Sequence, residues 1–392
     1  MLPKNRKTRV GILFGGKSAE HEISLQSAGN VFDAIDRSKF EPILIGIEKS
    51  GKWRLAGDSV SLLAPGKPVA LLPSGAGAAF CAMARDSADG APAGGAGSAS
   101  ADGASAASAF SGGAFESGAI ASGLNLDVVF PILHGPFGED GTVQGLLRLA
   151  GVPFVGSGVL GSAAGMDKDV MKRLFRDAGI PIGKFLSFRA GEALPSFAEI
   201  EAALGSPVFV KPANMGSSVG ISKAASQAEF SAAAKEAFQY DSKVVVEERI
   251  AGREIECAVL GNEAPAASVP GEVIPRHDFY SYDAKYLDDN GAALEVPAKI
   301  AAESARRIQE LSVKAFQALG CEGLARVDFF LRENGEPLIN EINTMPGFTK
   351  ISMYPKLWEA SGIGYAELIA RLIALAMERF EKDRALKTSR LG

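Results

Sequence analysis

Cysteine is scarce in this chain of 392 residues, and long apolar runs are lacking. Cys81, Cys257 and Cys321 are widely spaced and form no CxxC motif or Cys/His cluster, so the sequence supports neither a disulfide framework nor a zinc site. The apolar run near the N-terminus is too short for a secretory signal, and no later stretch approaches the length of a membrane span. We therefore expect a cytoplasmic protein with no membrane partner.

Basic residues are not in surplus, because 41 lysines and arginines face 46 aspartates and glutamates and leave a formal net charge of −5. Without a basic face there is nothing to displace the counterions of a phosphate backbone, which argues against a nucleic-acid partner. Apolar residues make up 47% of the chain. The chain is also longer than an ordinary domain with a single hydrophobic core. We expect a globular protein of two or three domains that acts on small molecules.

The first third of the chain is typical of an α/β domain. Residues 9–14 predict an apolar strand that leads through a glycine turn into helical spacing over residues 20–35, and strands are expected at 41–47 and 126–132. This order predicts an open, mostly parallel sheet. Residues 74–123 are almost entirely Ala, Gly and Ser, which bury too little apolar surface to offset their ordering entropy. We expect a mobile surface insertion there.

Two later loops carry groups that suit a bound nucleotide. The glycines and hydroxyls of residues 213–220, ANMGSSVG, can approach phosphate oxygens closely, although a long hairpin turn is the alternative. Residues 276–290 fit no regular period, and long loops of this kind are usually lids or binding loops. Lys285 and Tyr286 are the most evident chemical groups of this loop. His134 ends a predicted strand, where open α/β sheets bind ligands, but its position alone favours a structural histidine.

Residues 324–347 have the typical signal of a β-hairpin. Asn334-Gly335 separates two apolar runs and predicts a two-residue type I′ turn, with Glu333 facing Glu336. Alternate residues of each strand then face the core. This predicted core face consists of Val327, Phe329, Leu331, Leu338 and Ile342.

The same register brings two carboxylates together on the other face of the hairpin. Asp328 lies opposite Glu341, and Arg326 opposite Asn343. Carboxylates about 5 Å apart repel each other by about 3 kcal/mol at an effective dielectric constant of 20, so a positive group is needed between them. The oxygens of Asp328, Glu341 and Asn343 suit Mg²⁺, which usually accompanies nucleotide phosphates. The alternative is a salt bridge in which Arg326 neutralises the pair.

Five sequence blocks occur together in one order: GGKSAEHEIS, HGPFGEDGTVQG, VKPANMGSSVGI, YDAKYLD, and RVDFFL with NEINTMPGFT. Outside the insertion, the chain resembles the D-alanine:D-alanine ligases of the ATP-grasp superfamily. The resemblance implies an α/β and α+β fold, in which an N-terminal open parallel-sheet (pre-ATP-grasp) domain precedes a two-lobed ATP-grasp fold. We expect domains at residues 1–155, 156–248 and 249–392. The insertion is longer than is usual in the family, which leaves the packing of the first domain and any dimer contact open.

The resemblance also implies how ATP, the co-substrate, is held. Two Mg²⁺ ions that share Glu341 are expected, with Mn²⁺ as the alternative metal. The residues expected at ATP are Lys168 and Lys211 at the phosphates, Glu247, Glu248 and Ile250 at the adenine edge, Glu254 at the ribose, and Phe330 against the adenine. The expected metal ligands are Asp328, Glu341 and Asn343, the residues that the hairpin register had brought together.

The implied reaction joins two D-alanines through an acyl phosphate, for peptidoglycan precursor and cell wall synthesis, and releases ADP and phosphate. Catalysis of this kind depends on positioning and charge stabilisation. The residues expected at the two D-alanines are Glu20, Ser217 and Tyr286 as a closing triad, Lys285 at the γ-phosphoryl, Arg326 and the Gly347 N–H at the oxyanion, and Ser352 with His134 at the second substrate. For His134 the resemblance reverses the structural interpretation.

The lid tyrosine Tyr286 favours D-alanine over D-lactate as second substrate, because relatives that use D-lactate lack it. The family also suggests a homodimer. Two alternatives are another ATP-grasp carboxylate–amine ligase with a different acceptor, and an inactive nucleotide-binding module. Ser352 and Tyr286 separate the first alternative from a D-alanine ligase, since they serve the acceptor and not ATP. The second predicts a broken metal face, yet all three expected ligands are present.

Overall fold

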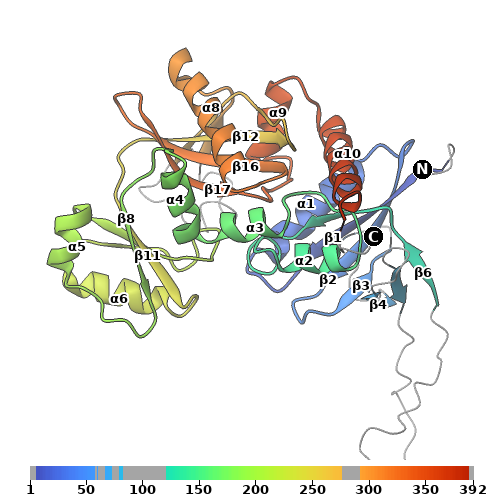
Figure 1. Cartoon of the computed structure of the whole chain (residues 1–392), viewed down its shortest axis with the longest axis horizontal. Coiled ribbons are helices and arrows are strands. Elements are labelled where there is room, and N and C mark those ends of the chain that lie inside the picture. Colours follow the sequence, from blue (N-terminus) through green and yellow to red (C-terminus); the bar gives the residue numbers. More distant parts are fainter. Residues whose placement is uncertain are drawn as a thin grey trace, which may run out of the picture.

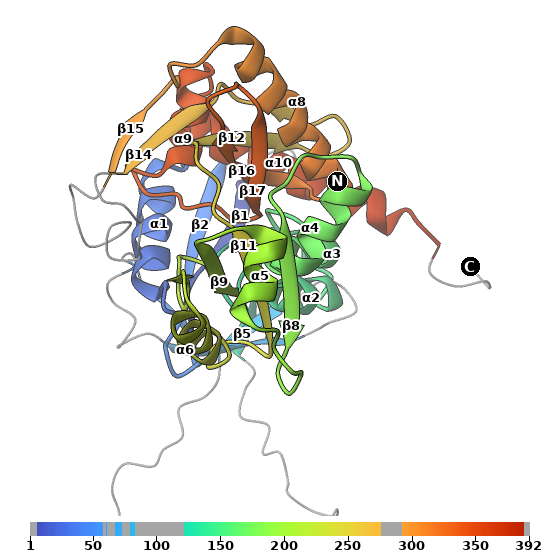
Figure 2. The same ribbon diagram turned by 90° about the vertical axis from the view of Figure 1, so that its left-hand side faces the viewer.

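The computed structural model describes residues 6–57, 60, 67–72, 79–82, 121–275 and 292–387. Its described residues form three sheets, each with its own helices (Figure 1). In that view the second sheet and its helices lie at the lower left, the third sheet above, and the first sheet at the right. Figure 2 looks from the side of the second sheet and shows its strands in front of the first sheet.

The first sheet has the strand order β6-β5-β4-β3-β2-β1-β7, and β1 pairs in parallel with both β2 and β7. Its strands are β1 (Thr8–Gly15), β2 (Phe40–Ile47), β3 (Trp53–Leu55), β4 (Lys67–Leu72), β5 (Ala79–Ala82), β6 (Ala121–Asn125) and β7 (Val128–Ile132), and its helices α1 (His21–Ala34) and α2 (Thr142–Leu149). The three strands that the sequence identified are therefore parallel, as predicted. The sheet continues beyond them through antiparallel pairs from β2 to β6, so it is mixed.

The expectation of a structureless insertion over residues 74–123 is wrong at its two ends. Residues 79–82 form β5, which pairs with β4, and residues 121–125 form β6 beside it. Both are short and rich in Ala, Gly and Ser, so their composition carries little strand signal, and pairing of β5 with β4 and of β6 with β5 supplies the order that the local sequence does not. The stretch between them lies outside the described residues.

The second sheet is antiparallel and has the order β10-β9-β11-β8. It consists of β8 (Phe185–Arg189), β9 (Val208–Pro212), β10 (Ser222–Ala224) and β11 (Lys243–Glu248), with helices α5 (Phe197–Leu204) and α6 (Gln227–Ala237). Helix α5 begins at a capping box, in which Ser196 accepts from the Glu199 N–H and the Glu199 side chain accepts from the Ser196 N–H. The loop of residues 213–220 connects β9 to β10.

The third sheet runs β15-β14-β12-β16-β17, with β13 paired to β12. It consists of β12 (Arg253–Gly261), β13 (Ala266–Ala267), β14 (Gly271–Pro275), β15 (Ala292–Glu295), β16 (Gly323–Leu331) and β17 (Pro337–Asn343). The remaining helices are α3 (Val159–Met166), α4 (Lys168–Asp177), α8 (Ala302–Ala318), α9 (Met353–Ala360) and α10 (Tyr365–Arg384). Although α3 and α4 precede the second sheet in the chain, they contact β17. The expected domain boundaries stay predictions.

The β16–β17 turn differs from the predicted one. The Gly335 N–H donates to the Arg332 carbonyl at 2.9 Å and Gly335 has φ 81°, so the loop contains three residues and Arg332, not Glu333, faces Glu336. A β-bulge at Asn340 removes this offset of one residue before the carboxylates are reached. Asp328 consequently pairs with Glu341, and Arg326 with Asn343, as predicted.

Between the turn and the bulge the shifted register exchanges two side chains. Leu338 pairs with Phe330, on the face opposite to the one predicted, and Ile339 enters the core in its place. Val327, Phe329, Leu331 and Ile342 lie in the core beneath the third sheet, as expected. The predicted core face is thus correct apart from Leu338.

The apolar clusters of the described residues connect the sheets unequally. One cluster joins β1, β2, β7 and α1 of the first sheet to α9, α10 and β12. A second lies between the third sheet and α3, α4 and α8, and a third covers the other face of the first sheet with α2. The cluster of the second sheet contains residues of that sheet, its helices and their connections alone. Apolar packing therefore joins the first and third sheets, whereas the second has a core of its own.

No single helix in the described ranges has the length and apolar composition needed to cross a membrane; α9 and α10 meet the test only together, as a pair bent by 103°.

Candidate active site

A cavity of about 510 Å³ opens where the three sheets meet. Its wall contains residues of α1 and of the segment that follows β7, part of the 213–220 loop, and residues of β12, β16 and β17. Twelve of the predicted site residues line it: Glu20, His134, Lys168, Ser217, Glu254, Arg326, Asp328, Phe330, Glu341, Asn343, Gly347 and Ser352. Four other described ones lie outside this lining, namely Lys211, Glu247, Glu248 and Ile250. Lys285 and Tyr286 lie outside the described residues.

The floor of the cavity is the β16–β17 hairpin face. Arg326 binds Asp328 through two contacts, with Nε and Nη2 each 2.7 Å from a carboxylate oxygen, and its Nε lies 2.9 Å from Glu256 Oε2. Lys168 Nζ lies 3.5 Å from Glu341 Oε2. Protein cations therefore supply the positive charge that the paired carboxylates require, as the salt-bridge alternative predicted for Arg326.

The floor also has the oxygen donors that a hard cation prefers. Asp328, Glu341 and Asn343 are half-buried at paired or adjacent positions of two rigid strands and line the same cavity. The described residues contain no group of three or more His, Cys, Asp or Glu side chains arranged to hold a metal. The expected set has two carboxylates and one amide, and its oxygen-only chemistry fits Mg²⁺.

Glu256 belongs to this floor, and sequence reasoning missed it. It pairs directly with Asp328 across β12 and β16, so Glu256, Asp328 and Glu341 form a row over three adjacent strands. The available signal was the alternation of polar residues along β12, in which Glu254 and Glu256 face the cavity together.

A second group of charges lies where α4 approaches β11. The Glu247 carboxylate is 2.8 Å from Lys211 Nζ and 3.3 Å from Lys172 Nζ. Burial alone would raise the pKa of Glu247, but the two ammonium groups outweigh burial and lower that pKa to about 2. Sequence reasoning identified Lys211 and Glu247 but missed Lys172, which is buried beside them and would have been taken for a surface lysine of α4.

The 213–220 loop contacts the N-cap residue of α1 across the cavity. The Ser217 hydroxyl donates to the Glu20 carboxylate, which joins two members of the predicted closing triad. Ser217 and Ser218 have φ values of 51° and 60°, a left-handed conformation that only a loop held in place by its surroundings maintains. Lys168 Nζ donates to the Met215 carbonyl at 2.7 Å, so the loop is anchored from α4 as well.

His134 is buried, and its two ring nitrogens have protein partners. Its Nδ1 lies 3.1 Å from the Met345 carbonyl, which can only accept, so Nδ1 carries the proton. The Ser27 hydroxyl lies 3.4 Å from Nε2 and accepts from the Phe348 N–H at 3.2 Å. Burial lowers the pKa of His134, with Glu20 acting in the opposite direction, which favours a neutral ring. The histidine, which follows β7 of the first sheet, thus connects to the loop that carries Gly347.

Glu139 is a buried carboxyl of the same wall that sequence reasoning did not identify. It accepts from the Gly135 N–H at 2.7 Å and lies 3.9 Å from His134 Nδ1. Burial, with the charge of Glu20 adding to it, raises the pKa of Glu139 well above its usual range. Its place in the block HGPFGED, five residues after His134, was the available signal.

The far end of the cavity is formed by the loop before α9. Ser352, the N-cap residue of α9, has its Oγ 2.7 Å from Thr349 Oγ1 and accepts from the Thr349 N–H at 3.0 Å. A Cβ added at Gly347 would lie 2.9 Å from that oxygen, so a side chain at Gly347 would displace Ser352. Two predicted residues are therefore in mutual contact here.

The comparisons with known proteins agree with this geometry. Residues 9–157 match the family model "D-ala D-ala ligase N-terminus", and residues 174–374 match "D-ala D-ala ligase C-terminus". The chain is 52% identical over 386 residues to the D-alanine–D-alanine ligase of Shouchella clausii strain KSM-K16, with 98% of each chain covered.

Solved structures give the same result. The D-alanine–D-alanine ligase from Coxiella burnetii aligns with a TM-score of 0.80 and 35% identity over 96% of each chain. The VanG D-Ala:D-Ser ligase from Enterococcus faecalis aligns with a TM-score of 0.78 and 35% identity, over 95% of this chain and 100% of that one. The chain belongs to the D-alanine–D-alanine ligase family.

Proposed function

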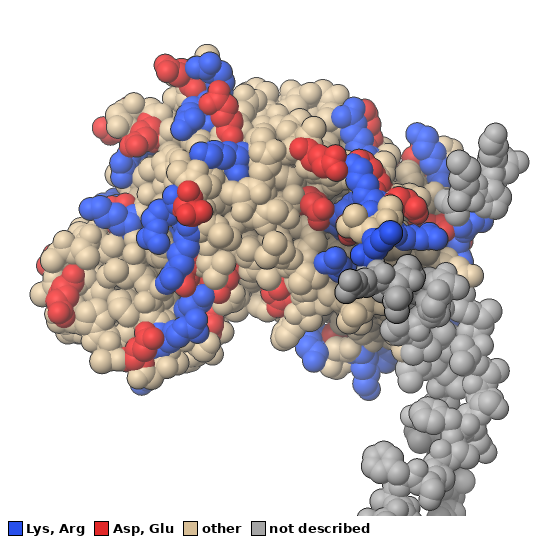
Figure 3. Space-filling view, viewed as in Figure 1, with Lys and Arg blue, Asp and Glu red and all other residues tan. Residues whose placement is uncertain are grey.

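We propose that this protein ligates two D-alanine molecules to D-alanyl-D-alanine at the expense of ATP, which supplies a peptidoglycan precursor. The observation that carries the proposal is the cavity itself, in which α1, the segment after β7 and the 213–220 loop surround the β16–β17 carboxylates of the third sheet. The face shown in Figure 3 has Lys and Arg interspersed with Asp and Glu, which agrees with a small-molecule substrate.

In this proposal the adenine of ATP lies near β11, and its phosphates lie over the β16–β17 hairpin face. Lys168 and Lys211 are the phosphate cations of this proposal, and Glu247, Glu248, Ile250, Glu254 and Phe330 are its adenine and ribose contacts. Asp328, Glu341 and Asn343 would hold two Mg²⁺ ions, or Mn²⁺, with Glu341 shared. The chemistry that such ions supply is neutralisation of the phosphate charge.

In the first step a carboxylate oxygen of the first D-alanine forms a bond to the γ-phosphorus of ATP, and the bond from that phosphorus to ADP breaks. Glu20 holds the ammonium group of this D-alanine. The Ser217–Glu20 contact, completed by Tyr286, closes the loop over the site and excludes water, which would otherwise hydrolyse the acyl phosphate. Lys285 reaches the transferred phosphoryl group.

In the second step the amine nitrogen of the second D-alanine, after losing a proton, bonds to the acyl carbon and phosphate leaves. The Arg326 guanidinium and the Gly347 N–H stabilise the oxyanion that forms between these events. Ser352 binds the carboxylate of the second D-alanine, with His134 beside it. His134 also fixes the Met345 carbonyl and, through Ser27, the Phe348 N–H on the two sides of Gly347.

The proposal includes a cytoplasmic location and a homodimer as the functional assembly. It also retains the three domains at residues 1–155, 156–248 and 249–392. Sedimentation measurements test the proposed dimer, and limited proteolysis tests the proposed domain boundaries.

The first test measures phosphate release from ATP with D-alanine, D-serine, D-lactate or L-alanine. We expect release that requires both D-alanine and Mg²⁺. Faster phosphate release with D-serine or D-lactate than with D-alanine would mean that the acceptor is not D-alanine. Faster release with L-alanine would overturn the claim that the substrate is a D-amino acid.

The second test uses Glu341→Gln, which removes one charge from the hairpin face at nearly constant shape. Turnover should fall by about 100-fold or more, while thermal unfolding stays close to that of the unmodified protein. Glu333→Gln is the matched control, since Glu333 is an exposed glutamate in the turn of the same hairpin and should retain full turnover. Near-normal activity of Glu341→Gln would remove the metal site from the proposal.

A further inference from the structure

Helix α4 contacts the third and second sheets in two different ways. Its side chains Met171 and Phe175 are fully buried in the core beneath the third sheet. Its contacts with β11 and β8 of the second sheet are ion pairs and hydrogen bonds. The helix is thus fixed to the third sheet by apolar packing together with polar contacts of Lys168 and Lys172. The second sheet, in contrast, is held against it mainly by charge.

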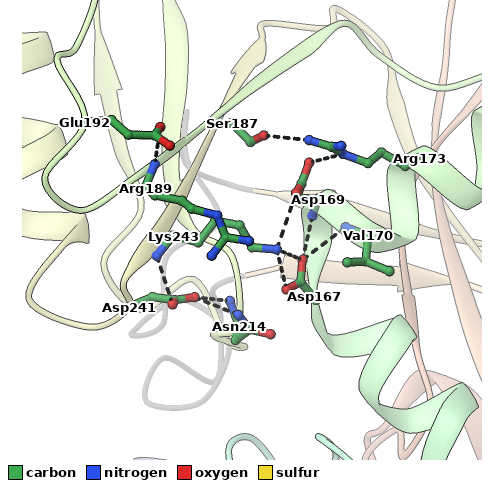
Figure 4. A network of polar contacts seen from close by, with 10 residues as sticks. All are labelled: Asp167, Asp169, Val170, Arg173, Ser187, Arg189, Glu192, Asn214, Asp241 and Lys243. Carbon is green, nitrogen blue, oxygen red and sulfur yellow. Dashed lines mark hydrogen bonds and ion pairs between the residues drawn. The ribbon is translucent and has the colours of Figure 1, made fainter.

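Lys243, the first residue of β11, is the centre of these polar contacts (Figure 4). Its Nζ lies 2.6 Å from Asp167 Oδ2 and 3.3 Å from Asp169 Oδ2. Asp167 is the N-cap of α4 and accepts from the N–H groups of Asp169 and Val170 at 3.1 and 3.0 Å. Lys243 is 7% exposed and Asp169 5%, so the cluster is screened from water.

Helix stability gives no reason for an ammonium group at this place. The N-terminus of a helix carries partial positive charge, which favours Asp167 and Asp169 but disfavours Lys243. Neither the core of the second sheet nor the core beneath the third includes Lys243. The value of the ammonium group must therefore come from what it joins, which is the end of β11 and the start of α4.

The end of β11 that Lys243 occupies also carries the base of the 213–220 loop. The Lys243 carbonyl accepts from the Ala213 N–H at 2.9 Å, and the Lys243 N–H donates to Asp241 Oδ1 at 3.1 Å. Asp241 Oδ2 accepts from the N–H and the side-chain Nδ2 of Asn214, at 2.7 and 2.9 Å. From the helix side, the Lys168 N–H donates to the Ala213 carbonyl at 3.0 Å.

The opposite end of β11 is attached to the same helix with the charges exchanged. There the acid Glu247 is on the strand and the base Lys172 on the helix, with Nζ and Oε1 3.3 Å apart. Sliding α4 along β11 in either direction would bring like charges together, so the two clusters permit one relative position. One cluster lies at the proposed adenine end and the other beside the proposed phosphate cation Lys168.

We propose that Lys243 is a positioning residue for the nucleotide: by holding Asp167 and Asp169, it sets the place of the Lys168 ammonium and of the 213–220 loop at the triphosphate. The inference rests on the proposed nucleotide site but not on the identity of the acceptor. It assigns Lys243 no contact with either amino-acid substrate.

The test is Lys243→Met, which keeps the length of the side chain and removes its charge. We expect the dissociation constant for ADP with Mg²⁺, measured by titration calorimetry, to rise by about tenfold or more. The KM for ATP should rise in parallel, whereas the KM for the first D-alanine should change by about twofold or less. Substitution of a residue with a merely structural role would change the KM values for ATP and D-alanine together, or change neither.

Arg173→Met is the matched control, because Arg173 binds the same Asp169 at 2.7 Å but has a side chain that is 58% exposed. Nucleotide affinity should change by less than about twofold in this variant. The double variant Asp167→Asn with Lys243→Met should recover part of the lost affinity, since asparagine still caps α4 and leaves no unpaired carboxylate there.

Normal ADP affinity in a folded Lys243→Met variant would overturn the inference, as would an equal loss for nucleotide and D-alanine. If Lys243→Met does not fold, Asp167→Asn alone decides the question, with an expected loss of about threefold or more in ADP affinity at unchanged D-alanine KM. Failure of the proposed function can be told apart from failure of this inference. If the unmodified protein binds ADP but ligates no D-alanine, the ADP affinities of the variant and the unmodified protein can still be compared by calorimetry.

Discussion

Two joints between sheets differ in the kind of contact that forms them. The first, between the first and third sheets, is the apolar joint; the second, between the second and third sheets, is the polar joint. Apolar side chains of β1, β7, α1, α9 and α10 form one continuous core across the first joint. Ion pairs between α4 and β11 dominate the second joint, and the core of the second sheet stays separate. Apolar packing is non-directional, whereas the paired charges of α4 and β11 favour one relative position. The first and third sheets thus share one core, while the second sheet is held in place mainly by polar contacts.

The largest effect is expected from Phe348→Ala in the apolar joint. Phe348 is fully buried. The centroid of its ring lies 5.5 Å from that of Phe130 of β7, 5.6 Å from that of Tyr354 of α9 and 6.2 Å from that of Tyr365 of α10. Truncation leaves a cavity between both sheets and should lower the free energy of unfolding by about 3–5 kcal/mol, measured by urea denaturation.

Phe230→Ala is the counterpart in the core of the second sheet, where Phe230 is also buried. It removes the same number of atoms, but the second sheet should then unfold in a separate, earlier transition while the rest keeps its midpoint. A single transition, shifted as far as in Phe348→Ala, would show that the polar joint couples the sheets as firmly as the apolar one does.

A smaller and pH-dependent effect is expected from Glu247→Gln in the polar joint. The depression of the Glu247 pKa from 4.5 to about 2 corresponds to about 3 kcal/mol of stabilisation by Lys172 and Lys211. Since the unfolded chain binds the proton more readily, this stabilisation is complete above pH 4.5 and is lost as the pH falls toward 2. The variant should therefore be less stable than the parent at pH 7, and the difference should shrink by pH 3. Equal differences at pH 7 and pH 3 in urea denaturation would contradict the ion-pair account.

Local pattern was sufficient to predict the two strands of the hairpin and the pairing of its carboxylates. The pairing of Asp328 with Glu341 was predicted correctly because two deviations cancel: the turn has one residue more than a type I′ turn, and the bulge at Asn340 restores the register. Leu338 lies between them and was assigned to the wrong face. The carboxylate pair was thus predictable, whereas the path of the backbone between turn and bulge was not.

The residues that sequence reasoning missed share one property. Glu139, Lys172 and Glu256 are ionisable side chains that belong to the site or its support through the folded surroundings: the first two are buried, and Glu256 is half-buried beside Asp328. Glu256 meets Asp328 across two strands 72 positions apart, and Lys172 meets Glu247 across 75. The local sequence can indicate that such a side chain is unusual, as the polar alternation of β12 does for Glu256, but it does not reveal the distant partner. The resemblance to a family supplied the catalytic blocks but not their supports.

The smallest effect is expected from Ser27→Ala, which alters a polar chain from His134 to the Phe348 N–H in the apolar joint. The Ser27 Oγ accepts from the Phe348 N–H at 3.2 Å and lies 3.4 Å from His134 Nε2. Alanine fits the space but leaves a buried N–H without its partner, which should cost about 1–2 kcal/mol in urea denaturation. Because the chain also fixes the loop that carries Gly347, turnover should fall further than stability explains, while ADP affinity stays unchanged. Ser24→Ala is the control, since Ser24 is equally buried on α1 but contacts Gly15 and Ile132, away from that loop. Equal loss of turnover in both serine variants would mean that the apolar joint acts on the site through overall stability alone.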